Sequence, residues 1–230
     1  MFFPIRDTVP SRSLPLVTIL LIAVNTVIFI LEVAMGSRAL SGFVARNGLV
    51  PSHVTYVLEH GQAVSVSAFL PFFYSMFLHG GWLHLIGNMW FLWIFGDNVE
   101  DRLGHFKYLV FYLLCGLLGN AGHYVFNPAS SMPTIGASGA IAGVLGAYAV
   151  SYPRARILVL LFLFFFVQFV ELPALLVLGL WFLLQFVNGA ASLVASTETG
   201  GVAWWAHIGG FVGGIVIFYL FRPRPKYRYV

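Results

Sequence analysis

The chain reads Thr134-Ile-Gly-Ala-Ser138-Gly-Ala-Ile-Ala-Gly-Val-Leu-Gly146 across its most informative stretch. One serine stands here among glycines and alanines, at the start of an apolar run that ends near Ser151. A helix over 138–151 is about 20 Å long, whereas a hydrocarbon core is ~30 Å thick. In a membrane, Ser138 would lie about 10 Å below one surface. Backbone N–H groups and the positive end of the helix dipole would stabilise a developing oxyanion there.

The same stretch has a purely structural interpretation. The four glycines of the run can form a helix-packing face of small residues, with Ser138 serving only as an N-cap. The choice between the two depends on the rest of the chain.

Composition identifies an integral membrane protein. The 230 residues are 60% hydrophobic and only 9% charged, which excludes an ordinary soluble domain. The net charge of +4 is spread over short loops and ends, so we relate it to topology and expect no nucleic-acid partner. Cys115 is the one cysteine, which excludes an internal disulfide, and we expect it to be a small core residue.

Hydropathy predicts an all-α, polytopic bundle of six transmembrane helices. The membrane domain covers 14–221, after a polar cytoplasmic lead at 1–13 and before a basic cytoplasmic tail at 222–230. The segment 36–71 is expected to fold at the membrane interface. The tract 157–170 is expected to re-enter the membrane or to lie on its surface. A complete membrane crossing is the remaining alternative. The predicted spans are about 14–35, 83–95, 106–126, 138–151, 172–189 and 202–221.

The placement of Lys and Arg favours six spans over seven. With six spans both termini are cytoplasmic, and only Arg38 and Arg46 lie outside. A seventh span would place the basic tail outside. The residues expected inside are Arg6, Arg12, Arg102, Lys107, Arg154, Arg156, Arg222, Arg224, Lys226 and Arg228.

His207 is the expected partner of Ser138. It lies in the first turns of the last span, at a depth similar to that of Ser138. Gly-x-x-x-Gly pairs follow it, and Gly139 and Gly143 offer a matching face for close helix approach. A histidine with a near-neutral pKa could take the serine proton and return it to a leaving amine. The structural alternative is a hydrogen-bonding histidine between helices.

His84 and Asn88 are candidate oxyanion donors together with the Ser138 amide. Their i, i+4 spacing places both on one face of the second span. An interhelical polar clamp is the alternative. No acidic residue is clearly placed to orient His207, which favours a Ser/His dyad. We expect no metal site, because the outer half of the membrane offers these histidines no obvious carboxylate or thiol partner. We expect no cofactor, because the serine chemistry requires none. Trp181 and Gln185 share one face of the fifth span, with core packing as their default explanation.

The combined motifs resemble the rhomboid intramembrane serine proteases. They are Gly136-Ala-Ser138-Gly139, His84-Leu-Ile-Gly-Asn88, Gly96-Asp-Asn-Val-Glu100-Asp-Arg102-Leu-Gly104 and Ala206-His207-Ile-Gly-Gly-Phe-Val-Gly-Gly214. The resemblance covers nearly the whole chain, in the right order. It implies Ser138 as nucleophile, His207 as base, and His84, Asn88 and the Ser138 amide as oxyanion donors. It also implies transmembrane protein substrates with a helix-destabilised cleavage region.

Two residues depart from the pattern of some relatives. Ala142 stands where an aromatic residue can pack against the catalytic histidine, so another group must orient His207, for example Tyr148 or an outer-loop residue. Gly87 stands where a bulky side chain can help close the lateral gap toward span five, so the gap here is expected to be looser.

The sequence therefore predicts an intramembrane serine endopeptidase, with the bilayer and transmembrane proteins as partners. The short cytoplasmic ends favour a prokaryotic cytoplasmic (inner) membrane. The alternative is a non-catalytic, rhomboid-like protein that binds membrane clients. A transporter is a more distant choice, because neither paired intramembrane charges nor broken helices in two related halves are apparent.

Overall fold

A computed structural model describes residues 2–60, 66–163, 166–195 and 202–222. Two short 3-10 helices, η1 (Val66–Ala68) and η2 (Ser75–Phe77), flank α4, and the strands are β1 (Phe2–Asp7), β2 (Arg156–Leu163) and β3 (Phe166–Pro173). The α-helices are α1 (Leu16–Ala34), α2 (Ser37–Asn47), α3 (Pro51–Glu59), α4 (Leu70–Tyr74), α5 (Trp82–Leu103), α6 (His105–Phe126), α7 (Ser138–Ser151), α8 (Ala174–Ala195) and α9 (Trp204–Phe221).

The helices identify an integral membrane protein. Within the described residues, four helices are long and apolar enough to cross a bilayer: Leu16–Ala34, His105–Phe126, Ala174–Leu193 and Trp204–Phe221. Helices also cover the two remaining predicted ranges, but α5 carries charged residues in its last turns and α7 has only 14 residues. The fold is thus mostly helical, with helices at all six predicted ranges.

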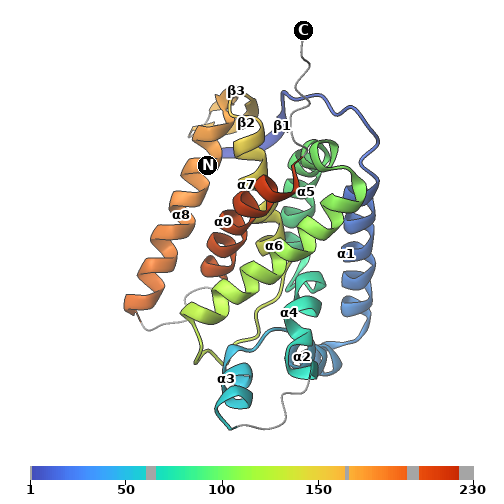
Figure 1. The fold of residues 1–230 in the computed structure, drawn as a ribbon, viewed down its shortest axis with the longest axis vertical. Coiled ribbons are helices and arrows are strands. Elements are labelled where there is room, and N and C mark those ends of the chain that lie inside the picture. The colour runs from blue at the N-terminus through green and yellow to red at the C-terminus, as the bar shows by residue number, and fades with distance from the viewer. Residues whose placement is uncertain (1, 61–65, 164–165, 196–201, 223–230) are drawn as a thin grey trace.

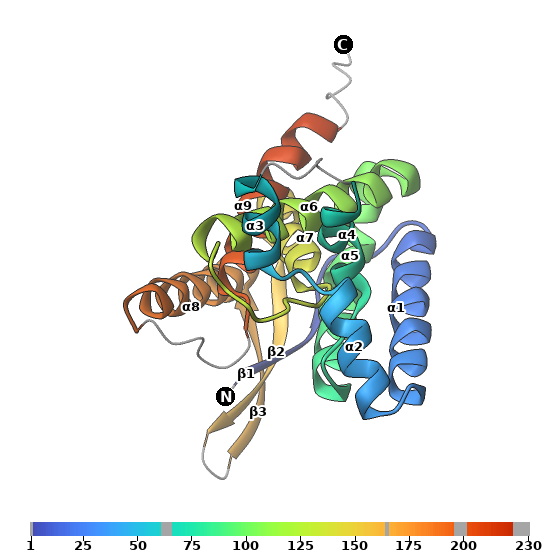
Figure 2. The ribbon, with the colours of Figure 1, turned by 90° about the horizontal axis from the view of Figure 1, so that it is seen from below.

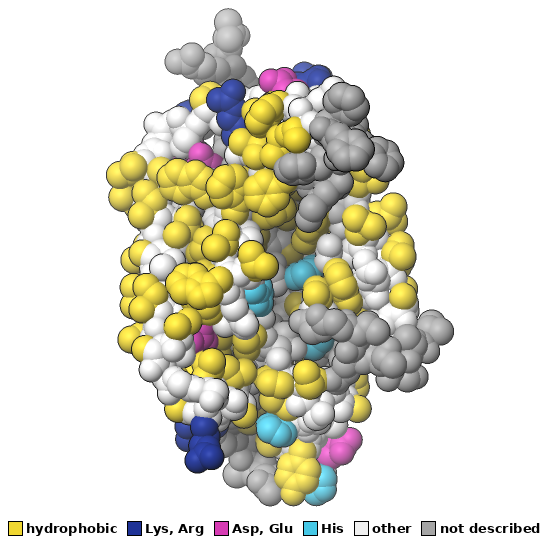
Figure 3. All heavy atoms as spheres, turned by 180° about the vertical axis from the view of Figure 1, so that it is seen from behind, with side chains coloured by type: hydrophobic (Ala, Val, Ile, Leu, Met, Phe, Trp, Pro, Cys, Tyr) yellow, Lys and Arg dark blue, Asp and Glu magenta, His cyan; other side chains and the backbone are white. Residues whose placement is uncertain are grey.

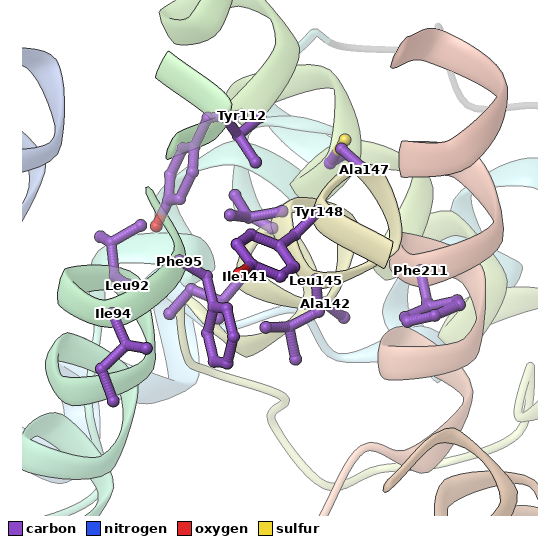
Figure 4. Packing of buried hydrophobic residues seen from close by; sticks show 14 of the residues in the cluster. Leu92, Ile94, Phe95, Tyr112, Ile141, Ala142, Leu145, Ala147, Tyr148 and Phe211 are labelled. Carbon is purple, nitrogen blue, oxygen red and sulfur yellow. The ribbon is translucent and has the colours of Figure 1, made fainter. Parts of the chain in front are cut away.

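The serine helix α7 occupies the centre of the molecule (Figure 1). It packs against α5, α6 and α9, and every residue from Gly139 to Ala149 is buried. Such burial suits a helix that is apolar or small on all sides. Its one large aromatic in this run, Tyr148, meets Phe95 of α5 with ring centroids 5.0 Å apart (Figure 4).

Glycines allow α7 and α9 to approach closely. A Cβ at Gly210 would lie 1.9 Å from the carbonyl oxygen of Gly139, and one at Gly214 would lie 2.2 Å from that of Gly143. Neither distance is compatible with a side chain unless the helices move apart. The predicted pairing of small-residue faces is therefore confirmed, and it fixes where His207 lies relative to Ser138.

Glu100 of α5 binds the start of α1. Its carboxylate accepts the N–H groups of Val17 and Thr18 at 2.9 Å each, and the Thr18 hydroxyl at 2.8 Å. The carboxylate thus satisfies backbone donors that have no partner inside the helix. This buried contact joins the first long helix to α5.

A three-stranded antiparallel sheet shows that the expectation of an all-α fold was incomplete. The order is β1-β2-β3, with Asp7 opposite Ile157 and Arg156 opposite Pro173. The β2–β3 hairpin projects from the helices in Figure 2. Its apolar, β-branched and aromatic sequence is compatible with a strand as well as a helix, and hydropathy alone does not separate the two. The described residues of the tract 157–170 therefore form two paired strands, and part of the 1–13 lead is the third strand of the sheet.

The described residues of the segment 36–71 fold mainly into α2, α3 and the start of α4, and Leu49 of this segment pairs with Thr134 ahead of Ser138. Of the predicted basic tail, only Arg222 lies among the described residues.

Candidate active site

Ser138 and His207 meet at the N-terminal ends of two adjacent helices. His207 Nε2 lies 2.8 Å from Ser138 Oγ. Ser138 is the first residue of α7, and His207 lies in the first turn of α9. The close α7–α9 packing thus brings together two residues that are 69 positions apart in the sequence.

Gln185 of α8 contacts the other ring nitrogen of His207. Gln185 Oε1 lies 2.7 Å from His207 Nδ1, while Gln185 Nε2 donates to the Trp181 carbonyl at 3.3 Å. An amide oxygen can only accept, so His207 Nδ1 must carry the proton. The neutral ring then has a free lone pair on Nε2, which accepts the Ser138 hydroxyl proton. Gln185 therefore fixes the tautomer that a general base requires.

Two tryptophans pack against the His207 ring. The Trp181 ring of α8 lies 5.7 Å away, and the Trp204 ring lies 6.4 Å away in an edge-on arrangement. Trp181 thus supplies the aromatic contact that Ala142 cannot. The expectation that Tyr148 could orient His207 is wrong, because its hydroxyl donates to Asp7 at 2.6 Å. Gln185 and Trp181, assigned by default to core packing, both contact the histidine.

His84 lies next to the turn that leads into Ser138. A Cβ at Gly136 would lie 2.7 Å from His84 Nε2 and 3.7 Å from Ser138 Oγ. Gly136 also has φ of 129°, a conformation that favours glycine. Its missing side chain therefore lets His84 Nε2 approach the serine.

Asn88 follows His84 by one turn of α5 and is only 8% exposed. Its Nδ2 is buried and has no hydrogen-bond partner in the described part of the chain. A buried donor of this kind is costly unless a ligand or water uses it. This suits a group that binds an oxyanion during a reaction, whereas a clamp between helices would already be bonded.

The turn before Ser138 is held on two sides. Thr134 forms a β-bridge with Leu49, and the N–H of Gly136 donates to the Ser75 carbonyl at 2.9 Å. Ser75 is in turn held by Asn120 of α6, whose Nδ2 donates to Ser75 Oγ at 2.9 Å. Sequence reasoning missed Asn120 and Ser75, because no local motif links a helix amide to a residue 45 positions away.

A cavity of about 580 Å³ adjoins the site. Its wall includes His84, Thr134 and Ile135 on one side and Trp204 and Trp205 on another. Figure 3 shows histidine side chains along a hollow in a mostly hydrophobic face. Among the described residues no group of three His, Cys, Asp or Glu side chains could hold a metal ion.

Comparison with known proteins shows the family. The rhomboid domain profile matches residues 66–224, more than half of the chain. A mitochondrial presenilin-associated rhomboid-like protein A from Danio rerio is 30% identical over 196 residues, which cover 78% of this chain and 47% of that protein. The chain thus spans about half the length of this relative.

The rhomboid protease GluP of Bacillus subtilis is 44% identical over 70 residues, covering 30% of this chain and 13% of that protein. The putative rhomboid protease YdcA, also from B. subtilis, is 39% identical over 71 residues, covering 31% of this chain and 35% of that protein. The chain belongs to the rhomboid family.

Proposed function

We propose that this protein is an intramembrane serine endopeptidase that cleaves transmembrane proteins through a Ser138–His207 dyad. The observation that carries the proposal is the hydrogen-bonded series from Ser138 Oγ to His207 Nε2 and from His207 Nδ1 to Gln185 Oε1. Family membership supports it, because relatives of this chain include the rhomboid protease GluP.

The reaction follows from this geometry. His207 Nε2 removes the proton from Ser138 Oγ as that oxygen attacks the carbonyl carbon of the scissile peptide bond. The negative charge on the carbonyl oxygen is then stabilised by His84 Nε2–H, Asn88 Nδ2 and the Ser138 N–H. Collapse breaks the C–N bond, and His207 Nε2–H gives its proton to the departing amine. Water deprotonated by the same nitrogen hydrolyses the ester and restores Ser138.

The proposed dyad is oriented by a neutral group, because Gln185 and not a carboxylate contacts His207 Nδ1. A glutamine amide fixes the His207 tautomer but carries no negative charge, so it stabilises the transient imidazolium less than a carboxylate would. We therefore expect positioning to be the main contribution of Gln185 to the reaction.

The membrane arrangement belongs to the same proposal. Six helices, α1, α5, α6, α7, α8 and α9, would span the bilayer, with 1–13 and 222–230 on the cytoplasmic side of a prokaryotic inner membrane. The Ser138 end of α7 would face the outer side, and water would reach it through the adjoining cavity. Substrates would present a locally unwound segment, because the carbonyls of an intact helix are already hydrogen-bonded.

The test is cleavage of a transmembrane substrate by purified protein in liposomes. Ser138→Ala and His207→Ala are expected to abolish cleavage without changing thermal unfolding. Ser151→Ala is the matched control, because its hydroxyl bonds only within α7, to the Ala147 carbonyl in the described structure, and it should cleave like wild type. Absent cleavage by wild type, with substrate binding retained, would instead favour a non-catalytic client-binding protein.

A further inference from the structure

A buried carboxylate of α1 lies close to the candidate site but outside the proposed dyad. Glu32 is only 1% exposed, and its Oε2 accepts the backbone N–H of His79 at 3.2 Å. Its Oε1 is buried without a partner among the described residues. An acidic side chain is costly at such a position, which points to a specific role for the contact that it makes.

That contact holds the loop 78–81, which leads into α5. The next residue, Gly80, donates its N–H to His84 Nδ1 at 3.3 Å. A ring nitrogen that accepts a hydrogen bond from an amide cannot itself carry a proton. The neutral imidazole of His84 must therefore carry its proton on Nε2, the nitrogen that lies next to Gly136 and Ser138.

The His79 ring supports the same arrangement by packing. Its centroid lies 5.2 Å from that of His84, at an interplanar angle of 64°, and 6.4 Å from that of Phe29 on α1. The loop thus contacts His84 in two ways, through the Gly80 amide and through the His79 ring. Glu32 and Phe29 hold the loop from α1.

We propose that Glu32 is a positioning residue that keeps His84 in the Nε2–H tautomer. By binding the His79 amide, Glu32 holds the loop so that the Gly80 amide occupies His84 Nδ1. His84 then presents a hydrogen-bond donor, and not a lone pair, toward the carbonyl oxygen of a bound peptide. The oxyanion role of His84 rests on the proposed function, whereas its tautomer can be measured in an inactive protein.

The experiment is nitrogen NMR of ¹⁵N-histidine-labelled protein in the Ser138→Ala background, with His84 assigned from its loss in His84→Gln. We expect Nε2 of His84 to be protonated and Nδ1 to be bare. Glu32→Leu should give a mixture of tautomers. Glu32→Gln should keep the pure Nε2–H form, because the amide oxygen can accept the same His79 N–H. Asn25→Leu is the matched control, since Asn25 is also buried on α1 but donates to Leu21 of its own helix.

Cleavage kinetics give an independent readout in the Ser138 protein. Glu32→Leu should lower kcat about 10-fold or more with KM nearly unchanged, as expected when an oxyanion donor is weakened, and Glu32→Gln should restore it. A second pair covers the case in which Glu32→Leu does not fold. Gly80→Pro removes the donor amide, whereas Gly80→Ala keeps it and meets no atom closer than 3.8 Å.

A proton on Nδ1 of His84 in the Ser138→Ala protein would overturn the inference, as would an unchanged tautomer in a folded Glu32→Leu protein. If Glu32→Leu does not fold, an unchanged tautomer in Gly80→Pro would overturn it. If the tautomer shifts as expected but the wild-type protein cleaves no substrate, the positioning role of Glu32 stands and the proposed protease function fails.

Discussion

Gln185 Oε1 lies 2.7 Å from His207 Nδ1, so a neutral amide on α8 determines which nitrogen of the histidine faces Ser138. Replacing it with an apolar residue of similar size removes this constraint while keeping the packing. Gln185→Leu is therefore expected to lower kcat by about 10- to 100-fold, with a smaller effect on KM. Steady-state cleavage kinetics measure both. The control is Asn188→Leu on the same helix, whose amide donates to the Leu184 carbonyl. Equal rates for Gln185→Leu and wild type would exclude the orienting role.

Gly136 has to remain a glycine because of His84. An alanine would be strained at φ of 129°, and its Cβ would lie 2.7 Å from His84 Nε2. We expect Gly136→Ala to displace His84 and lower kcat by about 100-fold, comparable to the loss of an oxyanion donor. Gly87→Ala, where no atom lies within 4 Å of the added Cβ, should cleave at the wild-type rate. A fully active Gly136→Ala protein would remove His84 from the site.

The α7–α9 contact predicts a stability defect. Gly210→Ala places a methyl group against the Gly139 carbonyl, and the helices must separate to admit it. Overpacking of this kind typically costs about 1–3 kcal/mol, so thermal unfolding in detergent should shift to lower temperature. Gly179→Ala on α8, which meets nothing within 4 Å, should be neutral or slightly stabilising. An unchanged midpoint for Gly210→Ala would show that the two helices are less closely packed.

Asp7 of β1 predicts a pH dependence of stability. Burial raises the pKa of its carboxyl above the usual 3.8, although the hydrogen bond from Tyr148 opposes that shift. The folded protein therefore binds this proton more tightly than the unfolded chain does. The resulting stabilisation is fully present below pH 3.8 and is lost as the pH rises through the raised pKa. The Asp7→Asn side chain cannot titrate. The unfolding temperature of this variant, compared with that of wild type, should therefore increase as the pH rises through the raised pKa. If the unfolding temperatures of the two proteins change with pH in the same way, the raised pKa of Asp7 is contradicted.

Gly87 predicts an effect on substrate access. Space beside it is open in the described structure, and the residue lies on α5 between His84 and Asn88. A bulky side chain in Gly87→Phe is expected to narrow the gap toward α8 and slow cleavage of transmembrane substrates severalfold. A short soluble peptide should be cut at an unchanged rate. If both substrates respond equally, the side chain acts on the site itself.

The sequence predicted Ser138, His207, His84 and Asn88 as site residues because each lies in a local motif at a helix end, where spacing alone assigns a face and a depth. Gln185 lacks such a signal. It lies in the middle of an apolar helix, and its role depends on how α8 packs against α9. The same applies to Glu32. The sequence places it only at an outer helix end or in a loop, and its contact with the loop 78–81 becomes visible only when α1 is packed beside that loop.

The sheet was missed for a different reason. The tract 157–170 is so apolar that hydropathy favours a membrane segment. The spacing of its apolar residues does not distinguish a strand from a helix. Besides its local pairing with β3, β2 pairs with residues 2–7, which lie about 150 positions earlier in the chain. No local rule makes that connection, so residues 1–13 were expected only to be a polar lead.

The complete burial of α7 from Gly139 to Ala149 has a consequence for the chemistry. A helix surrounded by other helices touches no acyl chains, so the local dielectric at its end is determined by protein groups and water. Changing the acyl-chain length or saturation of the lipids should therefore leave the bond-breaking step unaltered. Lipid composition would act earlier, on how often a substrate helix passes from the bilayer into the protein.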